Sequence, residues 1–289
     1  MLTQTDTAAP ARTGRKSQGI LRKVFQPKSI LSSDGELDMR RYFSRYLLVH
    51  THIAKTGGST FVTQLRGILG DEHVYDMRGG FAAPIKLPRE DLAKIWCLSG
   101  HFWYDTQERP IARRKRYLVN VRDPVDRFVS LYNYVAAAKG HPGHNKYGVL
   151  DIDSAFQYLK HHTPNQVSNA VCQMFGERAF SPRPRRPGRV INREAPVSFE
   201  QAKDIMEKHY ALVIPMKRLD DAIQGLGKAF GLEIPVVPHE NIGTKKVTAI
   251  SEETRQELLE MNKEDYKLIA HFDGLFDQHL KDLPARLLG

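Results

Sequence analysis

The sequence has only two cysteines among its 289 residues and no long run of apolar side chains. Cys97 and Cys172 are far apart and lie in apolar contexts, so we predict two buried free thiols rather than a disulfide framework or a zinc site. No run approaches the roughly 20 apolar residues that a membrane-spanning helix needs. The first residues also lack the apolar core of a secretory signal. We therefore expect a cytoplasmic protein with no membrane span.

Acidic residues are outnumbered: 33 Asp and Glu face 43 Lys and Arg, which gives a net charge of +10. Such an excess favours anionic partners without identifying them. The positive charge is scattered or lies in tails, and no nucleic-acid-binding module is present, so we expect no nucleic acid as partner. Much of the excess lies in residues 1–45, predicted to be a basic, disordered arm ahead of a single domain over residues 46–289. The proline- and arginine-rich stretch 182–189 predicts an exposed loop.

Short apolar strands alternate with amphipathic helices from residue 46 onward. Strands are predicted at residues 46–53, 94–100, 116–122 and 210–215. Asp123 and Ser198 stand where helix N-caps are expected. The alternation predicts an α/β fold: a P-loop-like domain with a central parallel sheet flanked by helices and a mainly helical C-terminal part.

A glycine turn rich in hydroxyl groups links the first strand to its helix. Its residues are Lys55, Thr56, Gly57, Gly58, Ser59 and Thr60. Glycines let backbone amides approach an anion, and the start of a helix directs unpaired N–H groups at it. The Walker pattern GxxxxGK[ST] fails, because Val49 and Ala54 occupy its two glycine positions. A tight strand-to-helix connection without a ligand would show the same glycines.

A second phosphate-binding pattern follows the strand at residues 116–122. Arg122 ends that strand and Ser130 follows about two helical turns later, so both can reach one phosphate. Alternatively, Arg122 forms a surface ion pair with Asp123 or Asp126, a common and weakly stabilising arrangement.

Together, the segments HIAKTGGSTF and VRDPVDRFVSLYNY resemble the two phosphate motifs of sulfotransferases that use 3'-phosphoadenosine-5'-phosphosulfate (PAPS). Their spacing is similar to the heparan sulfate and uronyl 2-O-sulfotransferase branch of carbohydrate sulfotransferases, over about residues 46–280. The resemblance implies that Lys55 contacts the oxygen bridging phosphate and sulfate, and that the turn after it cradles the 5'-phosphate. It implies that Arg122 and Ser130 hold the 3'-phosphate.

His101, in SGHFWYD, falls where this branch carries the histidine taken as catalytic base. The chemistry agrees, because a sugar hydroxyl is a poor nucleophile and histidine titrates near working pH. A core histidine hydrogen-bonded to the backbone is the alternative. Glu72 is the rival base, since other sulfotransferase branches use a glutamate shortly after the first loop.

Lys245 and Lys246 lie where the family often closes a basic loop over the nucleotide, which makes them candidate donor contacts, although solvated lysines in a turn are common. His141 and His144 resemble half a metal site, but no carboxylate or cysteine completes the set, so we predict no metal.

The resemblance thus implies direct sulfuryl transfer from PAPS to an acceptor hydroxyl, expected on a carbohydrate. An oligosaccharide, a glycolipid or a related hydroxylated metabolite would serve as acceptor. A nucleotide or sugar kinase on the same architecture is the main alternative. The broken Walker pattern and the lack of an evident Mg²⁺ ligand count against it.

Overall fold

The computed structural model describes residues 29–77, 87–101, 104, 111–175, 198–234, 247 and 249–289. Five parallel strands form one sheet in the order β2-β3-β1-β4-β5. They are β1 (Tyr46–Thr51), β2 (Val74–Met77), β3 (Cys97–Gly100), β4 (Arg114–Val121) and β5 (Tyr210–Pro215). The α/β class predicted from the sequence is confirmed, and β5 matches its predicted range.

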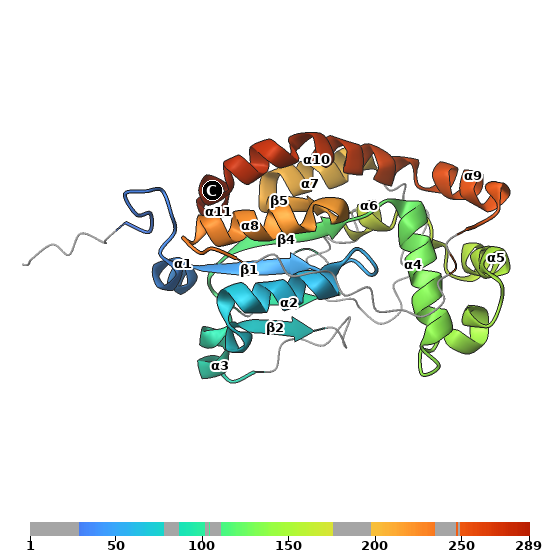
Figure 1. Cartoon of the computed structure of the whole chain (residues 1–289), viewed down its shortest axis with the longest axis horizontal. Helices are drawn as coiled ribbons and strands as arrows, with labels where there is room; N and C mark the ends of the chain where they lie inside the picture. The colour runs from blue at the N-terminus through green and yellow to red at the C-terminus, as the bar shows by residue number, and fades with distance from the viewer. Residues whose placement is uncertain are drawn as a thin grey trace, which may run out of the picture.

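Helices cover both faces of the sheet and extend beyond its carboxyl edge (Figure 1). The α-helices are α1 (Met39–Arg45), α2 (Gly58–Leu69), α3 (Arg89–Lys94), α4 (Pro124–Ala137), α5 (Ile152–His162), α6 (Ala170–Met174), α7 (Phe199–His209), α8 (Leu219–Ala229), α9 (Glu252–Met261), α10 (Lys263–Lys281) and α11 (Leu283–Leu288). Short 3-10 turns, η1 (Asp71–His73), η3 (Pro164–Gln166) and η4 (Met216–Arg218), and one π-turn, η2 (His144–Gly148), connect them. No helix among the described residues is long and apolar enough to cross a membrane.

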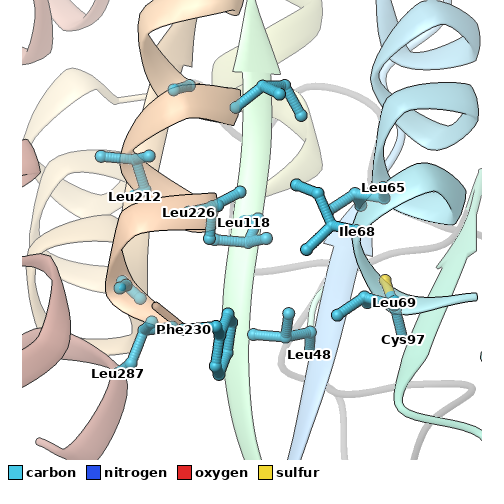
Figure 2. Close-up of a cluster of buried hydrophobic side chains, with 14 of the residues drawn as sticks. Leu48, Leu65, Ile68, Leu69, Cys97, Leu118, Leu212, Leu226, Phe230 and Leu287 are labelled. Atoms are coloured by element: carbon cyan, nitrogen blue, oxygen red, sulfur yellow. The ribbon is translucent and has the colours of Figure 1, made fainter. Parts of the chain in front are cut away.

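Alternating side chains of each strand divide between two cores, as the two-residue period of a strand requires. On β1, Leu48 packs with α2 and α8, whereas Leu47 and Val49 pack with the core under α7 and α10. Figure 2 shows the first core, where side chains of α2 and α8 meet over β1 and β4. Because both faces are covered, β1 and β5 are buried along their whole length and are mostly apolar, which is why the sequence revealed them.

A third core lies beyond the carboxyl ends of the strands, among α4, α5 and α9. Its buried members include Phe128, Phe156 and Leu258, one from each helix. This helical lobe places α4 across the edge of the sheet where the predicted phosphate motifs lie. α4 begins as predicted: Pro124 is its first residue, and the Asp123 carboxylate accepts hydrogen bonds from two first-turn amides.

A network of buried polar side chains joins the helical lobe to α10. The Asp265 carboxylate accepts the backbone N–H groups of Val171 and Cys172 at 2.9 and 2.8 Å, so it caps α6. In return, the Asn169 side chain accepts the Asp265 amide at the start of α10. Arg127 of α4 is buried nearby and interacts electrostatically with Asp265. This network fixes α4 relative to α10.

The folded domain includes residues before residue 46. α1 lies within the segment expected to be a disordered arm, yet its Tyr42 and Phe43 are buried in the first core. Ahead of it, the buried Leu37 donates its amide to the carbonyl of Ala229. The contribution was missed because Arg40 and Arg41 before the two aromatics, and Ser44 and Arg45 after them, give the segment a polar composition. Residues 1–28 and 182–189 lie outside the described residues.

Both cysteines are buried free thiols, as predicted. Burial is the main cause that raises the pKa of Cys97, to about 12, and the pKa of Cys172 is raised in the same direction. Neither thiol is therefore a nucleophile near neutral pH, because the thiolate is the reactive form.

Candidate functional site

Three candidate residues follow neighbouring strands at the carboxyl edge of the sheet. Lys55 follows β1, His101 follows β3 and Arg122 follows β4, with β1 between the other two strands. Parallel α/β sheets bind ligands at this edge, because loops and helix N-termini converge there. The sheet order therefore brings together side chains that are 21 to 67 residues apart in sequence.

The turn between β1 and α2 has an unusual backbone. Lys55 has φ 69° and Gly57 has φ 88°, so two left-handed residues flank Thr56. Lys55 and Asn169 are the two non-glycine residues with positive φ in the described part of the chain. Alternating backbone handedness turns successive N–H groups toward one point, which forms an anion-binding concavity. A left-handed non-glycine residue is strained, and such strain is concentrated at functional sites.

The N-terminus of α2 has no side-chain cap, whereas Asp123 caps α4. The first amides of α2 consequently remain available to an external anion. Ser59 and Thr60 are exposed in this first turn. Thr56 differs from the sequence expectation, because its hydroxyl is buried and donates to the Ile53 carbonyl at 2.8 Å. Its side chain therefore closes the loop from within, and its hydroxyl hydrogen is used by the Ile53 carbonyl.

Lys55 and Arg122 form a cationic pair. An Arg122 Nη1 donates to the Lys55 carbonyl at 3.3 Å. The pKa of Lys55 is lowered mainly by burial and, to a lesser extent, by repulsion from Arg122. Burial also lowers the pKa of Arg122, although the negative charges of Asp126 and Asp123 act in the opposite direction. Asp126 and Asp123 therefore act on Arg122 through charge, and among the described residues no carboxylate oxygen forms a salt bridge with either cation. Two half-buried cations close together favour an anionic ligand.

Tyr134 of α4 lies against Lys55. The Lys55 Nζ is 4.2 Å from the centroid of the Tyr134 ring, a cation–π contact. Ser130 stands four residues before Tyr134, so both lie on one face of α4. The face of α4 that carries Tyr134 therefore lies toward the loop of Lys55, and the pairing of Arg122 with Ser130 stays a prediction.

His101 is half-buried just after β3. Its Nδ1 lies 2.6 Å from the carbonyl oxygen of His52, which can only accept a hydrogen bond. Nδ1 therefore carries a proton, and in the neutral ring Nε2 carries the lone pair. This is the tautomer that a general base needs.

Glu72, the rival base, lies at the opposite edge of the sheet. It belongs to η1, after the C-terminus of α2, and precedes β2. α2 has 12 residues, so about 18 Å of helix separates Glu72 from the turn at Lys55. The position of Glu72 counts against a role beside His101.

The remaining candidates lie outside this cluster or outside the described residues. Lys245 and Lys246 lie outside the described residues. Their neighbour Val247 forms two backbone hydrogen bonds with the side chain of Asn133 on α4. His141 accepts an amide of its own turn, and His144 donates to the Val135 carbonyl. Across the described ranges, no group of three or more His, Cys, Asp or Glu side chains could hold a metal ion.

Three residues of the site were not identified from the sequence. His50 and His52 alternate along β1, so both point to the α2 face, and the ring of His52 lies 4.3 Å from that of His101. Two histidines at alternate positions of an apolar strand are the sequence signal that could have revealed them. Tyr134 had no such signal, because its role depends on how α4 crosses the sheet.

Comparison with known proteins agrees with this geometry. No curated protein matches the sequence. The sequence profile described as the sulfotransferase family matches residues 41–270, well over half of the chain, and includes both phosphate motifs. With a five-stranded parallel sheet flanked by helices, the chain is a sulfuryl-transferring enzyme and belongs to the sulfotransferase family.

Proposed function

We propose that the enzyme transfers the sulfuryl group of PAPS to a hydroxyl of a carbohydrate acceptor. The observation that carries this proposal is the cationic pair of Lys55 and Arg122 beside an uncapped helix N-terminus. PAPS has a phosphate at each end of its ribose and a sulfate beyond one of them. Two cationic residues after adjacent strands suit a ligand with two separate phosphate groups better than a ligand with only one.

The turn from Thr56 to Thr60 would bind the 5'-phosphate through its backbone amides and the hydroxyls of Ser59 and Thr60. Arg122 and Ser130 would bind the 3'-phosphate, the group that distinguishes this donor from ATP. We include Lys245 and Lys246 as further donor contacts, supported by the attachment of Val247 to α4 beside the site.

His101 would take the proton of the acceptor hydroxyl on Nε2 as the oxygen forms its bond to sulfur. The bond from sulfur to the bridging oxygen breaks in the same step, and Lys55 neutralises the charge that grows on that oxygen. The products are the sulfate ester, 3',5'-adenosine bisphosphate and a protonated His101. Positioning of donor and acceptor in line supplies the rest of the rate enhancement.

The experiment is transfer from labelled PAPS to a panel of oligosaccharides, glycolipids and smaller hydroxylated metabolites. His101→Ala should lower the rate of transfer about 10²- to 10⁴-fold, the usual cost of losing a general base. Its affinity for 3',5'-adenosine bisphosphate should stay near that of the wild type.

Glu72→Ala is the matched control, because it removes the other candidate base at the far edge of the sheet. It should retain the wild-type rate. A His101→Ala enzyme that keeps more than about a tenth of the rate, against the expected loss, would remove His101 from the mechanism. Labelled product on a non-carbohydrate acceptor alone would overturn the acceptor class and leave the donor assignment in place.

A further inference from the structure

Three histidine rings stand in a row across β1 and β3. The ring centroids of His50 and His52 are 5.4 Å apart, and those of His52 and His101 are 4.3 Å apart. His50 is completely buried, His52 is 4% exposed and His101 is half-buried at the surface of the site. The row therefore leads from the interior of the sheet to the proposed base.

The inner end of the row is rigid. His50 Nε2 lies 2.7 Å from Asn120 Oδ1, and His50 Nδ1 lies 2.8 Å from the Ser99 hydroxyl. Asn120 Oδ1 accepts, so Nε2 carries the proton and Nδ1 accepts from the hydroxyl. β3 and β4 thus hold this ring from both sides, and burial keeps it neutral by lowering its pKa to about 3.

The middle ring lies against the start of α2. A Cβ atom added to Gly58 would lie 2.2 Å from Cδ2 and 2.4 Å from Nε2 of His52. The absence of a side chain at Gly58 is therefore required by the His52 ring. One face of His52 thus contacts the turn predicted to bind the 5'-phosphate, while its ring also contacts His101.

The His52 backbone completes the contact with His101. Its carbonyl accepts from His101 Nδ1 at 2.6 Å and fixes the tautomer, while its ring supports the imidazole of His101. Both supports of His101 therefore come from one residue, one from its backbone and one from its side chain.

We propose that the His52 side chain is a positioning residue: it couples the phosphate loop at Gly58 to His101 and holds the base in the orientation and tautomer that transfer requires. This inference rests on the proposed role of His101 as base. His52 needs no proton transfer of its own. It acts through packing, so a flat ring of similar size should replace it.

The test compares His52→Ala and His52→Phe with the wild type. His52→Ala should lower kcat about 10²-fold, the cost of a misplaced catalytic group, with the affinity for 3',5'-adenosine bisphosphate changed less than about twofold. His52→Phe should restore kcat to within about tenfold of the wild type on the same scale. ¹⁵N NMR should show Nδ1–H for His101 in the wild type and a mixture of tautomers in His52→Ala.

His73→Ala is the matched control. His73 also stacks on a ring, that of Trp96 at 3.7 Å, and places Nδ1 2.7 Å from a backbone carbonyl, that of Lys94, but at the amino edge of the sheet. Its loss should lower thermal stability and leave kcat unchanged. If His52→Ala had the same effect as this control, the inference would be overturned.

The two proposals fail differently. If His101→Ala kept the wild-type rate, the base assignment would fail and the inference with it. If His101→Ala were inactive while His52→Ala turned over normally, only the positioning role would fail. If His52→Ala does not fold, two other measurements decide. A wild-type His101 that carries its proton on Nε2 would contradict the inference. A kcat of His52→Phe that is more than about 10²-fold below the wild type would contradict it as well.

Discussion

Acid should destabilise this protein in part through the buried His50. His50 is completely buried, and its pKa is lowered to about 3 from an ordinary value near 6.5. Burial is the main cause. The hydrogen bond with Asn120 opposes it, and the nearby His101 adds to it. In the unfolded chain the same ring is exposed to water and titrates at its ordinary value.

The sign follows from the number of protons that each state binds. Between pH 6.5 and about 3 the unfolded chain protonates His50 and the folded protein does not, so the free energy of unfolding falls as the pH is lowered through this window. Each unit of pKa difference corresponds to about 1.4 kcal/mol, so the full effect is roughly 5 kcal/mol. This is comparable with the whole stability of a small domain, about 5–15 kcal/mol.

Urea unfolding of the wild type and of His50→Gln at pH 7, 6, 5 and 4 measures the effect. Glutamine keeps a polar side chain of similar reach but does not titrate. The variant should be less stable at pH 7, and the difference should shrink by up to about 1.4 kcal/mol per pH unit below pH 6. The other groups titrate in both proteins and cancel in the comparison. Parallel pH dependence in the two proteins would refute the assignment of a neutral buried His50.

Three further predictions concern the network under α4, the cationic pair and the N-terminus. Asp265→Ala should lower the free energy of unfolding by about 3–5 kcal/mol, measured by urea unfolding, because it leaves two amides and a buried guanidinium without their carboxylate. Arg122→Ala should weaken donor binding, measured by calorimetry, by about 1.5–3 kcal/mol. Lys55→Ala should mainly lower kcat. A Lys55→Ala enzyme in which only the donor KM increases would contradict the role of Lys55. Deleting residues 1–28 should leave the melting temperature unchanged, whereas deleting residues 1–45 removes buried aromatics of α1 and should prevent stable folding.

Much of the fold could be predicted because the informative segments are locally determined. β5 is a run of apolar residues buried on both faces, and the N-caps Asp123 and Ser198 act through their own side chains on the amides that follow. β2 was missed, because it has four residues and includes the polar Asp76. A short strand of this kind forms only when the neighbouring strand β3 supplies its hydrogen bonds.

The candidate site was predictable to the extent that its motifs are contiguous in sequence. The turn after β1 and the start of α4 could be identified, but the contact between Lys55 and Tyr134 depends on the sheet order and on the helical lobe. The same holds for His52, whose role depends on the distance between the ends of β1 and β3. Thr56 was expected to offer its hydroxyl, yet the local fold uses that group internally.

The most direct test of the proposed donor is calorimetric binding of 3',5'-adenosine bisphosphate and of ADP, each with and without Mg²⁺. Arg122 and Ser130 should make the 3'-phosphate compound bind at least about tenfold more tightly, since a charge-assisted contact contributes about 1.5–3 kcal/mol. Mg²⁺ should have no effect on its affinity. Equal affinity for ADP, or binding that requires Mg²⁺, would contradict PAPS as the donor and favour a nucleotide with a free 3'-hydroxyl.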